Sequence, residues 1–399
     1  MKKQFLLLTC LLFVFRVHPS LPLWNVGDGD AETPADITSQ QRANLFTAEQ
    51  LAQIRVSEWI DSFYARRAKH DGFNGVVMIA KNGQIIYSNA FGYSNLETRE
   101  PLTLQSSLQL ASVSKTFTAA AVLLLAEQGF FSLDDTLCKF IPNFPYKAIT
   151  IKHLLTHRSG LPEYTHFDRE YFNSPCEYLS NSDVLNMLAR RKPALRYRPG
   201  YMFHYCNTNY VLLAALIEEV TQMSYAEFMQ RTIFEPLGMQ NTFVFDPDNP
   251  DLPVVPTYDT KGKYWSNNMF DGVTGDKGIY ASAEDLLKWD IALRSGLLLK
   301  EETLQDAYTP HSTDRYSFAK DKDKNYGYGW RLLRQPDRTY LVYHNGNWHG
   351  ANNVFARDID DGYTVIVLGN KSNPYNYWTQ PVWTWLQQLK TLEHTAFNP

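Results

Sequence analysis

Segments with β-strand patterns lie near both ends of this chain, and a long helical stretch separates them. Asn82-Gly83 stands between the first two segments and favours the tight turn of a β-hairpin. The helical patterns run from about residue 116 to residue 239. Because strands must pair, the simplest fold joins both ends in one antiparallel sheet with the helices inserted between them. The strand patterns cover residues 75–80, 84–87, 341–343, 353–356 and 363–368.

The pattern therefore predicts the α+β class: an antiparallel sheet flanked by terminal helices, with an inserted all-α domain. The first terminal helix is expected from Thr47, which is spaced from Gln50 as in a capping box, to His70. The second is expected over residues 377–392. We expect an α/β domain made of two separate segments and a helical domain between them. The predicted bounds are 46–115 and 270–399 for the α/β domain and 116–269 for the helical domain.

The N-terminal residues have the pattern of a secretory signal. Lys2 and Lys3 precede an apolar stretch over residues 5–15, which is too short to span a bilayer and suits the hydrophobic region of a signal peptide. We expect a signal peptide over residues 1–20 and a polar linker over residues 21–45. The protein is then exported, periplasmic or extracellular, without a stable membrane span; retention as an uncleaved anchor is the minor alternative. No clear cleavage site is visible.

Charge and cysteine content exclude other classes. The net charge is -4 and no basic stripe is present, so a nucleic-acid partner is not expected. Three cysteines follow the signal segment, Cys138, Cys176 and Cys206, at wide and irregular spacing. This spacing does not form a disulfide framework, so at most one bridge is expected, and free buried thiols are favoured.

Ser112 and Lys115 stand three residues apart, at the start of an apolar run that ends at Gly129. On a helix, this spacing puts a hydroxyl and an amine on one face, about one turn apart. The N–H groups and the dipole at a helix N-terminus favour developing negative charge. Burial disfavours the charged form of an amine, which can then accept the proton of a hydroxyl. The pair predicts an activated nucleophile, although a helix cap beside a solvated lysine gives the same four-residue pattern.

Two further motifs follow in order. Tyr205-Cys206-Asn207 precedes a helix, and His344-Asn345-Gly346 ends a strand. Together with Ser112 and Lys115, they resemble the three-motif pattern of the serine β-lactamase and penicillin-binding-protein superfamily, and in particular its class C branch, which contains DD-peptidases and esterases. The resemblance covers roughly residues 50–390 and implies the β-lactamase/DD-peptidase-like fold. Other stretches that look like this family are residues 153–162, 234–239 and 278–286.

The resemblance implies a role for each residue. Ser112 is expected to be the acylated nucleophile, and Lys115 either takes its proton directly or holds Tyr205 as the phenolate that does so. Asn207 offers an amide to Lys115 or to substrate, and His344, Asn345 and Gly346 of the third motif are also expected to bind substrate. The backbone N–H groups of Asn347 and Ser112 are expected to form the oxyanion hole. The family implies a serine hydrolase that acts on a small-molecule or peptide substrate, possibly derived from the cell wall, with no cofactor and no metal.

The third motif departs from the pattern of many β-lactamases. His344 stands where lysine is common, and Asn345 stands where a hydroxyl residue is common. A histidine near its reference pKa of ~6.5 is only partly charged at neutral pH, so it attracts a carboxylate weakly. We therefore expect the substrate to be an ester or a D-amino-acid peptide; a β-lactam is the less favoured substrate. Cys206 replaces a serine of the family, with little expected consequence.

Alternative interpretations remain open for these residues. Tyr205 could be a packing residue, Asn207 only a helix N-cap, and His344 only structural. His153 and His157, at i and i+4, could hold zinc on one helical face, although no glutamate stands between them as in zinc hydrolases. Two other functions on the same fold are a true class C-type β-lactamase and a non-catalytic sensor that binds a lactam or peptide.

Overall fold

The computed structural model describes residues 48–312 and 323–397 of the chain. The predicted signal peptide and linker, and the Thr47 cap, lie outside this range. None of the helices in the described part combines the length and the apolar character that a bilayer crossing requires.

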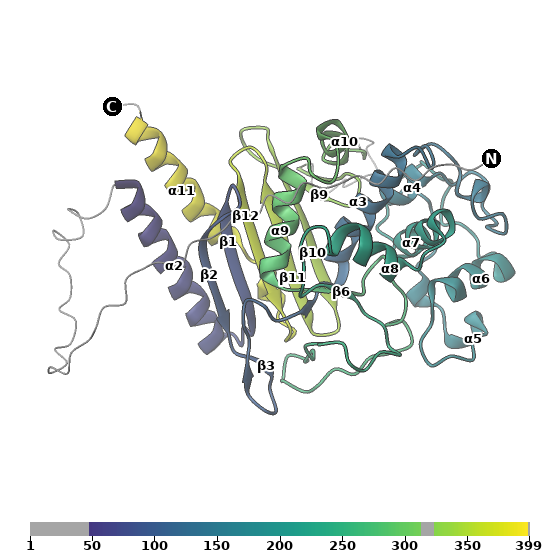
Figure 1. Ribbon diagram of the computed structural model, residues 1–399, viewed down its shortest axis with the longest axis horizontal. Coiled ribbons are helices and arrows are strands. Elements are labelled where there is room, and N and C mark those ends of the chain that lie inside the picture. Colours follow the sequence, from purple (N-terminus) through teal and green to yellow (C-terminus); the bar gives the residue numbers. More distant parts are fainter. Residues whose placement is uncertain (1–47, 313–322, 398–399) are drawn as a thin grey trace. The chain divides into compact units, whose positions relative to one another are not determined.

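The two ends of the chain form one antiparallel sheet of seven strands in the order β2-β1-β12-β11-β10-β9-β8 (Figure 1). The first strand of this sheet, β1, pairs with its last, β12, from Gly75 opposite Gly369 to Lys81 opposite Tyr363. The prediction that both ends share a sheet is confirmed. The strands are β1 Gly75–Lys81, β2 Gln84–Phe91, β8 Lys324–Tyr326, β9 Arg331–Arg334, β10 Tyr340–Trp348, β11 Ala351–Asp358 and β12 Tyr363–Gly369.

The predicted hairpin is also confirmed. Asn82 and Gly83 connect β1 and β2, with φ angles of 49° and 79°. Positive φ at both central residues is the requirement of a type I′ turn, whose twist matches that of the flanking strands. Asparagine and glycine are the residues that adopt this conformation most readily, which is why the dipeptide predicted the turn.

Both faces of the sheet are covered, and alternate residues of β1 point into different cores. Val77 and Ile79 join a core with the terminal helices α2 (Ala48–His70) and α11 (Gln380–Phe397). Figure 1 shows these two helices side by side on one face of the sheet. The second terminal helix begins at Gln380 rather than at residue 377, because residues Pro374–Tyr377 form the 3₁₀ helix η5.

Val76 and Met78 face the other core, which contains α3 (Ser114–Glu127), α9 (Ala283–Arg294) and the helices of the middle of the chain. The predicted helical domain, residues 116–269, also contains the two-residue strand β6, which pairs with β7. The division into two domains remains a prediction.

The other elements are β3 Tyr93–Asn95, β4 Glu100–Pro101, β5 Leu108–Gln109, η1 Ala111–Val113, η2 Leu137–Lys139, α4 Ile151–Leu155, η3 Tyr164–His166, α5 Arg169–Phe172, α6 Asn181–Arg191, α7 Thr208–Thr221, α8 Tyr225–Met229, η4 Gln230–Phe234, β6 Phe243–Val244, β7 Ile279–Ala281 and α10 Glu301–Ala307.

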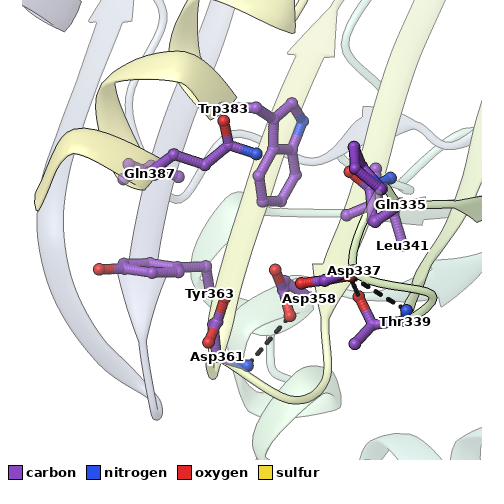
Figure 2. Close-up of a pocket in the computed structure, with 11 residues that line it drawn as sticks. Gln335, Asp337, Thr339, Leu341, Asp358, Asp361, Tyr363, Trp383 and Gln387 are labelled. Atoms are coloured by element: carbon purple, nitrogen blue, oxygen red, sulfur yellow. Dashed lines mark hydrogen bonds between the residues drawn. The ribbon is translucent and has the colours of Figure 1, made fainter. Parts of the chain in front are cut away.

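A cavity lies on the α11 face of the sheet (Figure 2). Trp383 of α11, Leu341 of β10 and Tyr363 of β12 line it. The carboxylates of Asp337 and Asp358 also line it, and both accept hydrogen bonds from the backbone of the turns beside them. These carboxylates are therefore held by local turns.

A buried charge cluster ties α9 to the sheet. The Asp290 carboxylate is fully buried and accepts hydrogen bonds from Arg357 Nε at 2.5 Å and from Thr364 Oγ1 at 2.7 Å. Arg294 Nε lies 3.0 Å from the same carboxylate. Burial alone would raise the pKa of Asp290, but Arg357 and Arg294 outweigh it and lower the pKa. One carboxylate thus compensates two guanidinium groups at the joint between α9, β11 and β12.

We expect Asp290→Asn to lower the free energy of unfolding by about 3–5 kcal/mol, because it leaves two guanidinium groups without a countercharge in the interior. Urea unfolding measures the change. The control is Glu227→Gln, which breaks an exposed pair with Arg231 at 3.0 Å and should cost less than about 1 kcal/mol. Equal effects of the two substitutions would contradict this account of the cluster.

Candidate active site

Ser112 lies in η1, a 3₁₀ turn that leads directly into α3, rather than inside the α-helix itself. The residue before it, Ala111, has a φ of 50°, a left-handed conformation that costs a non-glycine residue about 1–3 kcal/mol. Ser112 is half-buried, whereas Ser114 is fully buried and accepts a hydrogen bond from the Ile279 N–H. Of these two serines, Ser112 is the one that a substrate can approach.

Lys115 is fully buried and lies next to Ser112 as predicted. Its Nζ is 3.0 Å from Ser112 Oγ and donates to the Asp276 carbonyl oxygen at 2.7 Å. The same Nζ lies 5.1 Å from the ring centroid of Tyr205. The structure therefore brings the hydroxyl, the amine and the phenol of the first two motifs together.

Tyr205 has a hydroxyl that is buried and makes no hydrogen bond within the described residues. Its ring packs 4.3 Å from the ring of His157, and the Arg331 guanidinium carbon lies 4.9 Å from its centroid. A buried hydroxyl without a partner is costly. Tyr205 therefore has an unused donor and acceptor at the site, which a bound substrate or water can satisfy.

Asn207 precedes α7, but its side chain makes no capping hydrogen bond. Its backbone N–H instead donates to Glu163 Oε2 at 2.7 Å. The side-chain amide is therefore not used as an N-cap, contrary to the alternative considered from the sequence. Burial raises the pKa of Glu163, and the Asn207 N–H opposes this shift.

His344 ends a chain of hydrogen bonds whose directions the backbone fixes. Cys206 N–H donates to His157 Nδ1, so His157 Nε2 carries the proton and donates to Tyr326 Oη at 3.2 Å. His344 Nδ1 donates to the Asn345 carbonyl oxygen at 2.8 Å, so His344 Nε2 accepts from Tyr326 Oη at 3.1 Å. Each histidine thus has one protonated and one unprotonated ring nitrogen.

Both histidines are neutral. Burial, with Lys115, Arg331 and the other histidine adding repulsion, lowers the pKa of His157 well below its ordinary value. Burial, and after it the positive charges of Arg331 and Lys115, also lower the pKa of His344 well below its ordinary value. The expectation that His344 is partly charged at neutral pH is therefore wrong. With both ring nitrogens occupied, His344 offers a substrate carboxylate neither a charge nor a free donor.

Asn345 points to the opposite side of β10 from His344. Its side chain lines a cavity on the α11 face together with Tyr343 and Trp378. Adjacent residues of a strand face opposite sides of the sheet, so the inward direction of His344 turns Asn345 outward. The structure does not bring the Asn345 amide to Ser112, and its predicted contact with substrate is corrected.

Gly346 is the point at which β10 touches η1. A Cβ added to it would lie 2.2 Å from the Leu110 carbonyl oxygen, so only glycine allows this approach. Asn347 follows at an edge of β10 that β9 leaves unpaired, since β9 pairs with β10 only as far as Tyr343. The strand end that carries Asn347 thus lies beside the turn that carries Ser112, as the oxyanion-hole prediction requires.

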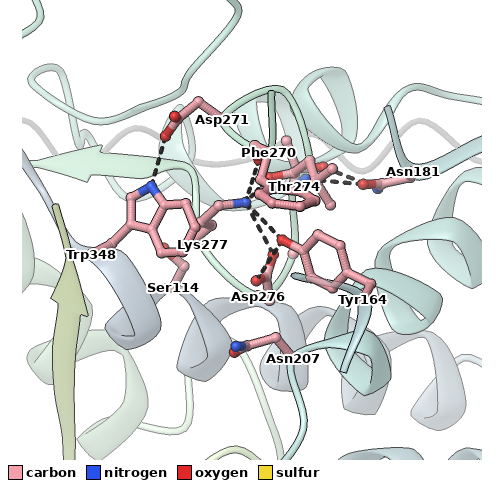
Figure 3. A network of polar contacts seen from close by, with 12 residues as sticks. Ser114, Tyr164, Asn181, Asn207, Phe270, Asp271, Thr274, Asp276, Lys277 and Trp348 are labelled. Atoms are coloured by element: carbon pink, nitrogen blue, oxygen red, sulfur yellow. Dashed lines mark hydrogen bonds and ion pairs between the residues drawn. The ribbon is translucent and has the colours of Figure 1, made fainter. Parts of the chain in front are cut away.

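A network around Lys277 holds the loop that contacts Lys115 (Figure 3). Lys277 Nζ donates to Tyr164 Oη at 2.9 Å, to the Val273 carbonyl at 2.9 Å and to the Phe270 carbonyl at 2.6 Å. Burial lowers the pKa of Lys277, and the adjacent Asp276 opposes this. All three N–H bonds of the ammonium are used to fix the loop that presents the Asp276 carbonyl oxygen to Lys115.

Sequence reasoning did not place five residues at this centre, and it considered one of them, His157, only as a zinc ligand. The chain carries no periodic signal for them, because their roles depend on contacts between distant segments. Two local signals were available: Asp276-Lys277 directly precedes one stretch that resembles the family, and His157 lies within another, residues 153–162. The five residues are His157, Asp276, Lys277, Tyr326 and Arg331.

The spacing argument for zinc does not hold. Helix α4 ends at Leu155, and His157 has a φ of 54°, so His153 and His157 do not share a helical face. His153 Nδ1 accepts a hydrogen bond from the Thr150 N–H instead. Within residues 48–312 and 323–397, no three His, Cys, Asp or Glu side chains are grouped to hold a metal ion.

The three cysteines of the described part are free thiols. The expectation that they would be buried is confirmed for Cys206 alone, since Cys176 is exposed and Cys138 is intermediate. Burial raises the pKa of Cys206 to about 12. Its Sγ lies 3.4 Å from the Leu161 carbonyl oxygen, so this side chain packs inside the fold.

Comparison with known proteins agrees with this geometry. The family described as Beta-lactamase matches residues 60–383. Penicillin-binding protein 4* of Bacillus subtilis (strain 168) is 33% identical over 345 residues, which are 83% of this chain and 73% of that protein. The octameric penicillin-binding protein homologue from Pyrococcus abyssi has a TM-score of 0.70 at 27% identity, covering 82% of this chain and 77% of that one.

A further solved structure shares the fold. The D-amino acid amidase from Ochrobactrum anthropi SV3, complexed with L-phenylalanine amide, has a TM-score of 0.66 at 21% identity, covering 88% of this chain and 100% of that chain. The family match spans all strands of the described sheet and all three motifs. The chain therefore belongs to the β-lactamase family of penicillin-binding-protein-like serine hydrolases.

Proposed function

We propose that this protein is an exported serine hydrolase that forms an acyl-enzyme on Ser112 and cleaves an ester or amide, such as a carboxylic ester or a D-amino-acid peptide. The observation that carries the proposal is the contact of Lys115 Nζ with Ser112 Oγ at 3.0 Å, beside the buried Tyr205 hydroxyl, which has no partner among the described residues. The pattern of residues 1–20 supports export to the periplasm or the cell exterior.

The mechanism starts with attack of Ser112 Oγ on the substrate carbonyl carbon. The serine proton goes to Lys115, or to Tyr205 held as a phenolate by Lys115. The oxyanion is stabilised by the N–H groups of Ser112 and Asn347. The bond to the leaving group then breaks, and Tyr205 gives the leaving group a proton, which Lys115 passes on to Tyr205 if Lys115 was the base; an acyl ester is left on Ser112. Water attacks this ester and gives one proton to the base, the base passes that proton to Ser112 Oγ as the acyl bond breaks, and the acid product leaves.

The third motif supports a substrate that does not depend on a carboxylate. His344 is neutral and has both ring nitrogens occupied, and the Asn345 amide points to the other face of the sheet. Neither side chain can bind an anion next to the scissile bond. The groups that remain to form hydrogen bonds with the amide groups of a substrate are the side chain of Asn207 and the backbone at the free edge of β10.

One observation favours a second candidate, a substrate with a carboxylate such as a β-lactam. The Arg331 guanidinium lies 4.9 Å from the Tyr205 ring centroid, and its Nε is buried without a partner in the described residues. A guanidinium binds a carboxylate through paired N–H groups. Arg331 would then replace the cation that the third motif lacks.

We expect Ser112 to be the serine labelled by a fluorophosphonate probe. Ser112→Ala should abolish labelling and lower turnover by about 10⁶-fold, with the thermal unfolding temperature unchanged. The matched control is Ser159→Ala, because Ser159 is buried and donates to Asn209 Oδ1 at 2.5 Å. Peptide mass spectrometry locates the adduct. Labelling that persists in Ser112→Ala would disprove the assignment.

Lys115 and Tyr205 should act as one proton-transfer unit. Lys115→Ala and Tyr205→Phe should each lower kcat strongly. The activation free-energy cost of the double variant should be much smaller than the sum of the two single costs, because each substitution disables the same proton transfer. The measurement is kcat for a p-nitrophenyl ester in all four proteins of the cycle. Additive losses would show that the two residues act separately.

Substrate preference separates the two candidates. We expect a neutral p-nitrophenyl ester or a D-amino-acid amide to be hydrolysed, and kcat/KM for nitrocefin to stay below about 10⁶ M⁻¹s⁻¹. We expect Arg331→Met to leave KM for the neutral ester within twofold. An efficient nitrocefin reaction that Arg331→Met weakens through KM would instead establish the carboxylate-dependent candidate.

A further inference from the structure

Tyr377, the last residue of η5, holds the carbonyl group of Gly346 in β10. Its hydroxyl donates to the Gly346 carbonyl oxygen at 2.8 Å. Asn352 Nδ2 of β11 in turn donates to Tyr377 Oη at 3.0 Å. Because a carbonyl oxygen can only accept, the direction of this chain is fixed from Asn352 through Tyr377 to Gly346.

The Gly346 carbonyl belongs to the same peptide unit as the N–H of Asn347. In a trans peptide these two groups point in opposite directions. The carbonyl points to the side of β11 and η5, where Tyr377 and Asn352 lie. The N–H therefore points to the other edge of β10, which β9 leaves unpaired beyond Tyr343, while η1 lies against β10 at Gly346.

We infer that Tyr377 is a positioning residue for the oxyanion hole, which fixes the plane of the 346–347 peptide and strengthens its N–H as a donor. The inference rests on the proposed function, in which this N–H stabilises the oxyanion formed at Ser112. A hydrogen bond to the carbonyl oxygen polarises the whole peptide group, and such polarisation along a chain strengthens each member. Tyr377 acts through the peptide and does not touch the substrate.

The surroundings of Tyr377 keep its hydroxyl a donor. Burial raises the pKa of Tyr377 to about 12, with the Asn352 hydrogen bond opposing the shift, so the phenol stays protonated at physiological pH. Asn352 is itself held, because its Oδ1 accepts from the Asn373 N–H at 2.6 Å. Its Nδ2 also lies 3.2 Å from Asn347 Oδ1, so the same amide orients both residues of the strand end.

Tyr377→Phe tests the inference because it removes only the hydroxyl. Loss of a whole oxyanion-hole donor costs about 10²–10³ in kcat, and Tyr377 acts one step away, so we expect kcat for a p-nitrophenyl ester to fall about tenfold. The KM should stay within twofold. The inhibition constant of phenylboronic acid, which forms a tetrahedral adduct with the nucleophile, should rise by a factor similar to the loss in kcat.

The matched control is Tyr375→Phe, in the same 3₁₀ helix, whose side chain is 60% exposed. It should leave kcat, KM and boronate inhibition unchanged. Unchanged kcat in Tyr377→Phe would overturn the inference. A loss that comes with an equal rise in KM and a lower unfolding temperature, but without weaker boronate binding, would also overturn it, because it would show a structural role only.

The wild-type protein separates this inference from the proposed function. Wild-type turnover with an acylated Ser112, together with the expected loss in Tyr377→Phe, supports both. Wild-type turnover with an unaffected Tyr377→Phe overturns the inference alone. A wild-type protein that is not acylated at Ser112 by any ester, amide or fluorophosphonate overturns the proposed function, and the inference falls with it.

Discussion

The close approach of η1 to β10 at Gly346 is the constraint on which the site depends. A carbonyl oxygen of the nucleophile's own segment occupies the space where any other residue would place its Cβ. This contact sets the distance between the turn that carries Ser112 and the strand end that carries Asn347. The left-handed backbone at Ala111 belongs to the same contact, since an added Cβ at Gly346 would also lie 3.3 Å from the Ala111 Cβ. The strained backbone at Ala111 and the lack of a side chain at Gly346 together allow the segments that carry Ser112 and Asn347 to come close to each other.

The polar groups behind the nucleophile divide into a satisfied set and an unsatisfied set. His157, Tyr326 and His344 use their ring nitrogens and hydroxyl on one another and on the backbone, so they are buried as neutral groups at little cost. Tyr205 keeps a buried hydroxyl that has no partner in the described part of the chain, and Lys115 contacts Ser112. Tyr205 and Lys115 are thus the groups available to react, while the fully hydrogen-bonded first set forms a rigid surface behind them.

The sequence predicted what local patterns and motifs determine. Runs of β-favouring residues predicted the long strands, Asn82-Gly83 predicted the hairpin, and motif order predicted Ser112, Lys115 and Tyr205, which the structure brings together. The short strands β8 and β9 were missed because three or four residues that include charged side chains do not form a recognisable run of β-favouring residues. Arg331 was missed with them, since only the pairing of β9 with β10 brings it to Tyr205. The direction of Asn345 was misjudged, although strand alternation after His344 already implied it.

The pairing of β1 with β12 has a consequence for the order of assembly. During synthesis, the hairpin of β1 and β2 emerges early but keeps one open edge until residue 369 is available to cover it. The strand that completes the hydrolytic centre comes almost as late. Folding must wait for this long-range closure, which slows it relative to a chain with local contacts. A growing polypeptide therefore carries Ser112 for most of its synthesis without Asn347, whose backbone N–H is the second donor of the proposed oxyanion hole.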